Sequence, residues 1–321
     1  MKVLLVRADG VGDALACTPL VAALRAAGHT LGAVLSTRNR AAFAARTFER
    51  VHVLERIPWP RHGSTSSSRC TALDEARAER YDVALVASEE LEAYELARDS
   101  RIARRVGFIN GWEKPLKTLR VRPLLTRALV RAASARRARE HEAQTLFGLG
   151  SMLHGECEPS RDPARLRLLL LDGEPSSTGR VALQTSTKFA SLGLDAPAFA
   201  DIARSLAERF ALDVLGDDPV LVERVAAASG ARALRDLDMQ RWKEAIVASR
   251  ALVTPDSGAA HVAGFTGTPC VDLFPAHATT VADVLRWRPW ASPSRVRVFA
   301  ADTRTPAFAR AVADDVTALA G

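Results

Sequence analysis

Residues 3–28, which read VLLVRADGVGDALACTPLVAALRAAG, decide the fold that the sequence predicts. The run at 3–6 is short, apolar and β-branched, which is typical of a buried strand. A glycine-containing turn follows it, and apolar residues then recur with a helical period until Gly28, a natural helix stop. The stretch therefore predicts a strand, a tight turn and a helix.

The same alternation runs through the rest of the chain. Further strands are expected wherever a short apolar run is bounded by turn residues, at 31–36, 51–55, 82–88, 180–186, 212–216, 251–255 and 269–274. Strands that alternate with helices predict parallel sheets with helices on both faces. By contrast, residues 97–149 have a helical and basic pattern that is broken near Gly107–Pro123.

Two domains are expected. Residues 155–179 are rich in Pro, Gly and Ser, which indicates a connection between domains. We therefore predict an α/β fold of two Rossmann-like doubly wound domains facing a cleft, residues 1–160 and 161–321. The last helix, at 308–320, could pack back on the first domain.

Composition excludes several classes of protein. The chain has 321 residues, 48% hydrophobic and 25% charged, which is a globular rather than a disordered or fibrous composition. No stretch reaches the ~18 apolar residues of a membrane span, and the apolar start is too short for a signal peptide, so a cytoplasmic protein is expected. Four widely spaced cysteines, without metal-ligand spacing, predict neither a disulfide framework nor a metal site: Cys17, Cys70, Cys157 and Cys270.

Positive charge is concentrated in one segment. The net charge is +7, and residues 98–140 hold thirteen Lys or Arg against three Asp or Glu. Such an excess attracts nucleic acid, an anionic membrane surface or a phosphorylated or carboxylated substrate, unless it is simply a solvated surface. No nucleic-acid-binding motif accompanies the segment and aromatic residues are only 6% of the chain, so nucleic acid is not expected.

Two strand-to-helix turns are candidates for ligand contacts, because open α/β sheets bind ligands at the carboxyl ends of their strands. In the first, residues 7–13, Gly10 and Gly12 permit a tight turn and Asp13 lies at the mouth of the helix. No third glycine follows at the spacing of a dinucleotide fingerprint, so an NAD site is not supported. Taken alone, Asp13 is better interpreted as a helix cap or a first-turn acid.

The second turn, residues 254–261, reads TPDSGAAH. Ser257 and Gly258 offer unhindered N–H donors at a helix start, which suits a phosphate, and His261 lies one turn further on. The alternative is that Asp256 or Ser257 caps the helix and that His261 is an ordinary surface histidine.

Together these segments resemble glycosyltransferase family 9, whose best-known members are ADP-heptose:lipopolysaccharide heptosyltransferases. VLLVRADGVGDALACTPLVAALR (3–25) is similar to the family's N-terminal signature, and VTPDSGAAHVAGFTGTPCVDLFP (253–275) to its C-terminal signature. HEAQTLFGLGSML (141–153) resembles the family's segment near the end of the first domain. The resemblance covers nearly the whole chain and implies a GT-B fold and an inverting, metal-independent sugar transfer that needs no cofactor.

The resemblance also implies roles for individual residues. Asp13 would be the general base that deprotonates the acceptor hydroxyl. The second domain would bind a nucleotide-sugar, for example ADP-heptose, through Thr185, Ser186, Thr187, Lys188, Asp217 (or its neighbour Asp218), Leu237, Asp256, Ser257, Gly258 and His261. The acceptor side would comprise the turn residues Arg7, Gly10 and Gly12 and, from the basic segment, Arg101, Arg104 and Arg105.

The expected function is transfer of a sugar to a hydroxyl of a lipopolysaccharide core or another acidic glycan or glycolipid. The enzyme would be cytoplasmic and could contact the inner membrane leaflet peripherally. One alternative is a nucleotide-sugar-binding protein without catalysis, which the presence of Asp13 and of the 256–261 turn argues against. The other is a nucleic-acid-binding protein that uses the basic segment.

Overall fold

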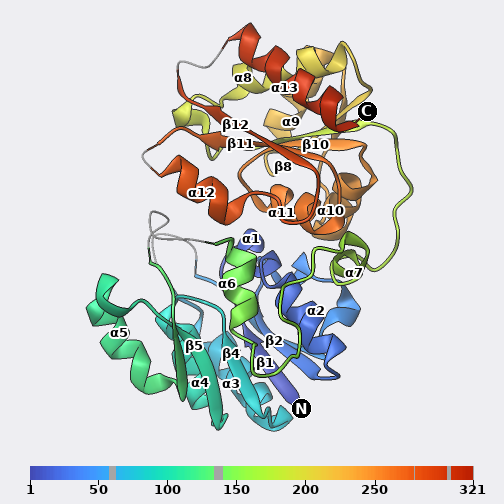
Figure 1. Ribbon diagram of the computed structural model, residues 1–321. Helices are drawn as coiled ribbons and strands as arrows, with labels where there is room; N and C mark the ends of the chain where they lie inside the picture. Colours follow the sequence, from blue (N-terminus) through green and yellow to red (C-terminus); the bar gives the residue numbers. More distant parts are fainter. Residues whose placement is uncertain (58–62, 134–139, 278, 302–304, 321) are drawn as a thin grey trace. The chain divides into compact units, whose positions relative to one another are not determined.

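The computed structural model describes residues 1–57, 63–133, 140–277, 279–301 and 305–320. The chain divides into two compact units, residues 1–160 and 161–321. Each unit is built around one parallel sheet with helices on its faces (Figure 1).

The first unit contains a six-stranded sheet in the order β3-β2-β1-β4-β5-β6. Its strands are β1 (Lys2–Val6), β2 (Thr30–Ser36), β3 (Arg50–Leu54), β4 (Val83–Val86), β5 (Arg104–Ile109) and β6 (Arg127–Val130). Its helices are α1 (Val11–Leu15), α2 (Thr18–Ala26), α3 (Ser66–Glu79), α4 (Leu91–Asp99), α5 (Pro115–Val121) and α6 (Glu142–Gly148). α3 and α4 cover one face, where they pack on side chains of β1 and β4, and α2 packs against α6.

The second unit repeats this plan with the order β12-β11-β10-β7-β8-β9. Its strands are β7 (Val181–Thr185), β8 (Leu212–Gly216), β9 (Arg232–Leu234), β10 (Ala251–Pro255), β11 (Cys270–Pro275) and β12 (Ser294–Phe299). Its helices are α7 (Pro163–Arg167), α8 (Ala196–Ala207), α9 (Pro219–Ser229), α10 (Met239–Ala248), α11 (Gly258–Thr266), α12 (Thr280–Trp287) and α13 (Pro306–Ala320).

Counted from the first strand of each unit, both sheets have the order 3-2-1-4-5-6 of doubly wound nucleotide-binding folds. In such a sheet the strand order reverses between strands 1 and 4, and the loops that follow these two strands diverge and leave a crevice. The crevice positions are therefore the loops after β1 and β4 in the first unit and after β7 and β10 in the second.

The helix ends of the second unit follow local sequence rules. At α9 the Asp218 carboxylate accepts hydrogen bonds from the Val220 and Leu221 N–H groups, Pro219 occupies the first turn, and Gly230 ends the helix at φ 68°. The Asp195 and Asp238 side chains cap α8 and α10 in the same way. These caps fix where each helix begins above the sheet edge.

The basic segment is folded differently from the prediction. The expectation that residues 97–149 are helical, with a break near 107–123, is wrong where β5 and β6 lie within them. The arginines of β5 and β6 hid the strand signal, which depends on alternation of apolar residues. β9 and β12 were also missed, and both are arginine-rich strands at the edges of the second sheet.

The apolar face of the last helix is used within its own unit. Ala309, Val312, Ala313 and Val316 of α13 are buried in the core of the second unit, where α13 packs against α8 and against β10 and β11.

Gly264 allows α11 to lie close to the 289–290 segment. A Cβ at this position would come within 2.6 Å of the Trp290 backbone nitrogen and 2.9 Å of the Pro289 Cα atom. We expect Gly264→Ala to lower stability by about 1–3 kcal/mol, because backbone atoms must move. Gly148→Ala is the matched control in a helix: nothing lies within 4 Å of its Cβ, and alanine is the better helix former. Thermal melting of the two variants checks this, and equal melting temperatures would contradict it.

Candidate functional site

The crevice of the first unit is organised by a buried arginine. Arg7 follows β1 and is only 2% exposed. Its Nη2 donates to Asp13 Oδ1 at 2.7 Å, its Nη1 donates to the Ala87 carbonyl oxygen after β4, and its Nε lies 3.6 Å from Asp9 Oδ2. Burial opposes the charge of Arg7, but the Asp9 and Asp13 carboxylates outweigh it and raise its pKa. Arg7 is therefore a permanent cation held between two strands.

A second layer of polar side chains holds this turn in place. Ser88 donates to Asp9 Oδ1 at 2.6 Å, and Asn39 Nδ2 donates to the carbonyl oxygens of Arg7 and Asp9, each at 3.0 Å. Burial raises the pKa of Asp9, against the opposing effects of Arg7 and Ser88. Sequence analysis missed Asp9, Asn39 and Ser88; the available signal was that Asp9 and Asn39 each follow a predicted strand and that Ser88 ends one.

Asp13 is the exposed member of this network. It is the third residue of α1, whose N-cap is Gly10 with no side-chain cap, so Asp13 is an acid of the first turn, as one of the two interpretations had it, and not the cap. Its side chain is 37% exposed and is oriented by Arg7. Arg7 itself is too deeply buried to be the surface contact for an acceptor that the sequence suggested; it acts on Asp13 instead.

The glycines of the turn provide space rather than unusual backbone angles. Gly10 has φ −71° and ψ 167°, which any residue can adopt. Its Cβ, however, would lie 3.0 Å from Asp13 Oδ2. Gly10 therefore leaves room for the carboxylate oxygen that does not contact Arg7. Gly12 lies within α1, between Gly10 and Asp13.

The three arginines placed on the acceptor side do not join Asp13. Arg104 and Arg105 begin β5, in register with Val83 and Ala84 at the start of β4, so they lie at the amino edge of the sheet. Asp13 follows the opposite, carboxyl ends of the strands. Arg101 and Arg104 line a surface groove with Arg77 and Arg80, and Arg105 donates to the carbonyl oxygens of Ile102 and Leu124. The grouping of Arg101, Arg104 and Arg105 with Asp13 is thus wrong.

Other basic residues of the segment do lie at the carboxyl edge. Arg131, which follows β6, is buried with its Nη2 2.5 Å from Glu142 Oε1 and its Nη1 3.1 Å from Glu89 Oε1. Lys117 Nζ contacts Glu89 at 3.0 Å. Although burial opposes it, Arg131 and Lys117 lower the pKa of Glu89. These residues hold β6, α6 and the loop after β4 together.

The crevice of the second unit contains the turn between β10 and α11. Ser257 is the N-cap of α11: its Oγ accepts from the Ala259 N–H at 3.3 Å and lies 3.1 Å from Thr254 Oγ1. Gly258 is the first residue of this nine-residue helix, and the Asp256 N–H donates to the Leu273 carbonyl oxygen at 3.0 Å. The half-buried turn therefore presents the positive end of a helix dipole at the carboxyl edge of the sheet.

The loop after the neighbouring strand β7 carries the predicted cation. Lys188 is exposed, its Nζ lies 4.6 Å from the centre of the Phe189 ring, and its backbone N–H donates to Ser186 Oγ at 3.2 Å. Thr187 is exposed beside it. Thr185 differs from the expectation, because it is fully buried and its Oγ1 donates to the Leu215 carbonyl oxygen at 3.2 Å. Its side chain is used between β7 and β8 and not in the loop.

The remaining predicted donor residues lie at the same edge or beneath it. Asp217 follows β8 and is exposed, whereas its neighbour Asp218 is engaged as the cap of α9. Leu237 follows β9 and is half-buried. His261 is 4% exposed and packs between Phe265 and Trp287, at 6.4 Å and 5.7 Å between ring centres, so it is not the surface histidine of the alternative interpretation.

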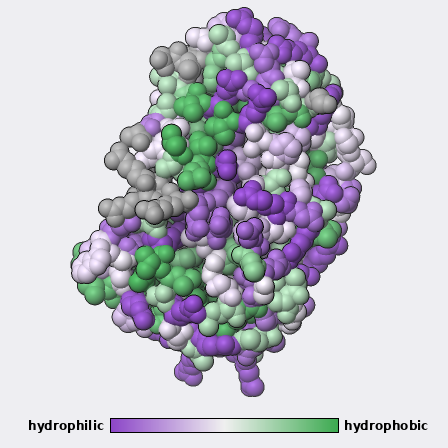
Figure 2. Space-filling view, viewed as in Figure 1, coloured by the Kyte–Doolittle hydropathy of each residue, from purple (hydrophilic) through white to green (hydrophobic). Residues whose placement is uncertain are grey.

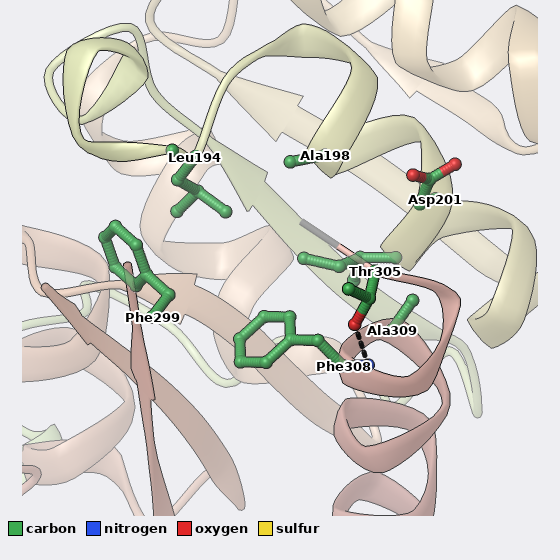
Figure 3. Close-up of a pocket in the computed structure, with 9 residues that line it drawn as sticks. Leu194, Ala198, Asp201, Phe299, Thr305, Phe308 and Ala309 are labelled. Atoms are coloured by element: carbon green, nitrogen blue, oxygen red, sulfur yellow. Dashed lines mark hydrogen bonds between the residues drawn. The ribbon is translucent and has the colours of Figure 1, made fainter. Parts of the chain in front are cut away.

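A small apolar pocket lies elsewhere in the second unit, between α8, β12 and α13 (Figure 3). Leu194, Phe299 and Phe308 point into it, and among the described residues that line it Asp201 alone is charged and pairs with Arg204 at 2.9 Å. None of the predicted donor residues lines this pocket. It is a gap in packing between two helices and not a site for a charged ligand.

The described part of the chain offers neither a metal site nor a membrane span. No group of three or more His, Cys, Asp or Glu side chains there is placed to hold a metal ion. No helix among those residues is both long enough and apolar enough to span a membrane.

Comparison with known proteins now adds to this geometry. No family model and no curated protein matches the sequence. Solved structures match in fold: E. coli heptosyltransferase WaaC with ADP has a TM-score of 0.76 at 17% identity over 99% of each chain. The chain has the heptosyltransferase fold. E. coli ADP-heptose lps heptosyltransferase II has a TM-score of 0.71 at 16% identity, covering 100% of this chain and 98% of that one.

A glycosyl transferase family 9 protein from Veillonella parvula DSM 2008 is similar as well, with a TM-score of 0.66 at 15% identity over 92% of this chain and 85% of that one. The heptosyltransferase fold confirms the predicted fold class and supports the predicted resemblance. Within this fold, both strand-order reversals carry the turns that the sequence motifs singled out, Arg7–Asp13 and Asp256–His261.

Asp272 is a buried acid beside the second turn. It lies on β11 opposite Thr254 of β10 and is fully buried, and neither carboxyl oxygen has a hydrogen-bond partner of normal geometry among the described residues. Burial raises its pKa well above the ordinary value, and the nearby Asp256 carboxylate adds to the effect. The folded protein therefore favours the protonated form of Asp272 more than the unfolded chain does.

This preference predicts a pH-dependent stability. As pH rises above about 4, the unfolded chain releases the Asp272 proton more readily than the folded protein does, because the pKa is raised by folding, so this residue lowers stability progressively. Asp272→Asn removes the titration, and we expect it to be more stable than wild type by about 1 kcal/mol or more at pH 8, with a difference that shrinks toward pH 4. The matched control is Asp213→Asn on β8.

Asp213 is also buried, but it pairs with Arg180 Nε and Arg232 Nη2, each at 2.6 Å. Its substitution by Asn should cost about 1–3 kcal/mol. Thermal melting between pH 4 and pH 8 compares the two variants. Asp272→Asn melting below wild type at pH 8 would show that the carboxyl has a partner that it needs.

Proposed function

We propose that this protein is an inverting glycosyltransferase that moves a sugar from a nucleotide donor to a hydroxyl of an anionic glycan or glycolipid. The observation that carries the proposal is the pair of equivalent crevices: one presents an arginine-oriented carboxylate, and the other presents a helix N-terminus beside an exposed lysine. A carboxylate suits the acceptor hydroxyl, and positive charge suits a diphosphate.

Asp13 is the general base of this proposal. Its Oδ2, for which Gly10 leaves room, takes the proton of the acceptor hydroxyl, while Arg7 holds Oδ1. The hydroxyl oxygen forms its bond to the anomeric carbon as the bond from that carbon to the diphosphate oxygen breaks. The leaving nucleoside diphosphate takes the electron pair and needs no proton.

The second unit binds the donor in this proposal. Ser186, Thr187 and Lys188 face the phosphates together with the backbone of Ser257 and Gly258, Asp217 holds the ribose, and Leu237 packs on the base. Lys188 and the helix dipole of α11 stabilise the negative charge that develops on the diphosphate. Similarity to structures determined with ADP and with ADP-2-deoxy-2-fluoro heptose supports ADP-heptose as the first donor to test.

Substitutions at Asp13 and Gly10 test the base. Asp13→Asn keeps an oxygen that can accept from Arg7 but cannot take the proton, and we expect kcat to fall about 10²–10⁴-fold with donor affinity and melting temperature unchanged. Gly10→Ala should lower kcat in the same direction, since its Cβ crowds Asp13 Oδ2 while its backbone angles suit alanine. Turnover near wild type in Asp13→Asn would show that Asp13 has only a structural role and is not the general base.

The donor side predicts transfer without a metal. With Lys188 and the α11 terminus as the only positive charges required, activity should survive excess EDTA, and Lys188→Ala should raise the donor KM. Turnover with and without chelator tests the independence from metal. Thermal shift with ADP-, UDP- and GDP-sugars identifies the donor for which KM is then measured. Complete loss in EDTA that Mg²⁺ or Mn²⁺ restores would contradict it.

A further inference from the structure

α5 and the residues beside it expose large apolar side chains. Trp112 is 95% exposed, Leu116 74%, Leu119 71% and Val130 76%, and we call these four residues the α5 face. Leu116 and Leu119 lie one turn apart on α5, and Trp112 lies in the 3-10 turn Gly111–Glu113 that precedes it. Val130 is next to this turn, because its Cγ1 atom lies 4.0 Å from the Cβ position of Gly111. Figure 2 shows hydrophobic surface over the end of the first unit where Figure 1 places α5.

The α5 face is held firmly in this orientation. On the opposite side of α5, Val121 and the following Leu124 are buried in the core of the first unit. Thr118 Oγ1 donates to the Gly111 carbonyl oxygen at 3.0 Å and joins the turn to the helix. Lys117 Nζ lies 3.0 Å from Glu89 Oε2 and ties the helix to the loop after β4. The exposure is therefore built into the fold and is not the result of a loose helix.

Basic side chains surround the α5 face. Residues 111–124 contain Lys114, Lys117, Arg120 and Arg122 against the single acid Glu113. Glu113 is engaged, since its Oε2 accepts from the Ala133 N–H at 2.9 Å, whereas Arg120 and Arg122 are exposed. Lys114 and Lys117 both contact Glu89, at 3.7 and 3.0 Å, so the exposed positive charge comes mainly from Arg120 and Arg122. The surface is thus an apolar centre with a cationic rim.

This chemistry selects an anionic lipid bilayer. Tryptophan and leucine insert favourably at the boundary between headgroups and acyl chains, and lysine and arginine at the rim attract anionic headgroups. A second copy of the chain fits less well, because a symmetric contact would set one cationic rim against the other. We propose that the α5 face docks this protein on the surface of an anionic membrane.

The position of the α5 face in the fold would bring a docked membrane close to Asp13. α5 follows the carboxyl end of β5, and its Lys117 contacts Glu89, the residue after Ser88 of the Asp9 network. A docked bilayer would therefore lie at the carboxyl edge of the first sheet, where Asp13 is exposed. The use of this docking for catalysis rests on the proposed function, since it assumes a lipid-linked acceptor, but the docking itself does not.

Vesicle binding tests the proposal without any turnover. The full chain is sedimented with vesicles of phosphatidylcholine alone and of phosphatidylcholine mixed with phosphatidylglycerol. We expect binding to the anionic vesicles, weakened by salt, and at least about a tenfold loss in the triple variant Trp112→Ser, Leu116→Ser, Leu119→Ser. These side chains are exposed, so melting temperature should be unchanged. Val220→Ser with Val281→Ser, at residues 77% and 87% exposed in the second unit, is the matched apolar control and should bind as wild type.

Two further comparisons locate the contact. Arg120→Gln with Arg122→Gln should weaken binding about 25-fold, at about fivefold for each cation lost near the membrane. Arg101→Gln with Arg104→Gln removes the same charge from the amino edge of the sheet and should have a smaller effect. Brominated lipids should quench tryptophan fluorescence in wild type and not in Trp112→Phe.

Wild type that fails to bind anionic vesicles would overturn the proposal, as would a triple variant that binds like wild type. Equal effects of the two arginine pairs would show attraction by net charge alone and would equally overturn it. So would self-association of wild type that the triple variant abolishes, because the face would then belong to a second copy. Loss of sugar transfer in Asp13→Asn with vesicle binding intact would separate the catalytic proposal from this one.

Discussion

At one point in each sheet, the loops that follow two neighbouring parallel strands lead to opposite faces of the sheet. The positions of the site residues depend on this reversal of strand order. β1 and β4 in the first unit and β7 and β10 in the second are adjacent, yet the loops after them diverge. Strand ends elsewhere in a doubly wound sheet are covered by their own connections, whereas these are left open. Arg7, Asp9, Asp13 and Ser88 gather at the first opening, and Lys188 and the Ser257 turn at the second.

The first opening is stabilised by charge rather than by apolar packing. Burying a guanidinium is costly unless it is paired, and Arg7 meets this requirement with Asp9, Asp13 and the Ala87 carbonyl oxygen. The contact between Arg7 and Asp13 therefore has two effects: it offsets the cost of burying the guanidinium, and it orients the exposed Asp13 carboxylate. The second opening uses a helix terminus and a flexible lysine instead, which suits a ligand that brings its own charge.

The basic segment shows that an excess of positive charge along the sequence need not form one positive patch on the surface. Its residues are divided between opposite edges of one sheet. Arg101 and Arg104 lie at the amino edge, whereas Arg131 lies at the carboxyl edge and forms ion pairs with Glu89 and Glu142. Among the described residues of the segment, the stretch around α5 combines exposed cations with exposed apolar side chains. A chain that reverses direction every few residues distributes a charge run over several surfaces, and no one-dimensional count can follow it.

The sequence by itself determined the alternation of strands and helices, the two candidate turns and the fold class, because periodicity, glycine and capping residues act over a few neighbours. It failed at the edge strands β6, β9 and β12 and at β5 beside an edge, where arginines interrupt the apolar pattern and only pairing with a neighbouring strand defines the element. Tertiary structure alone decided that Arg7 is buried against the Ala87 carbonyl oxygen and that Thr185 lies under its loop, bonded to Leu215. These outcomes depend on atoms from strands distant in sequence, whose approach no local pattern records.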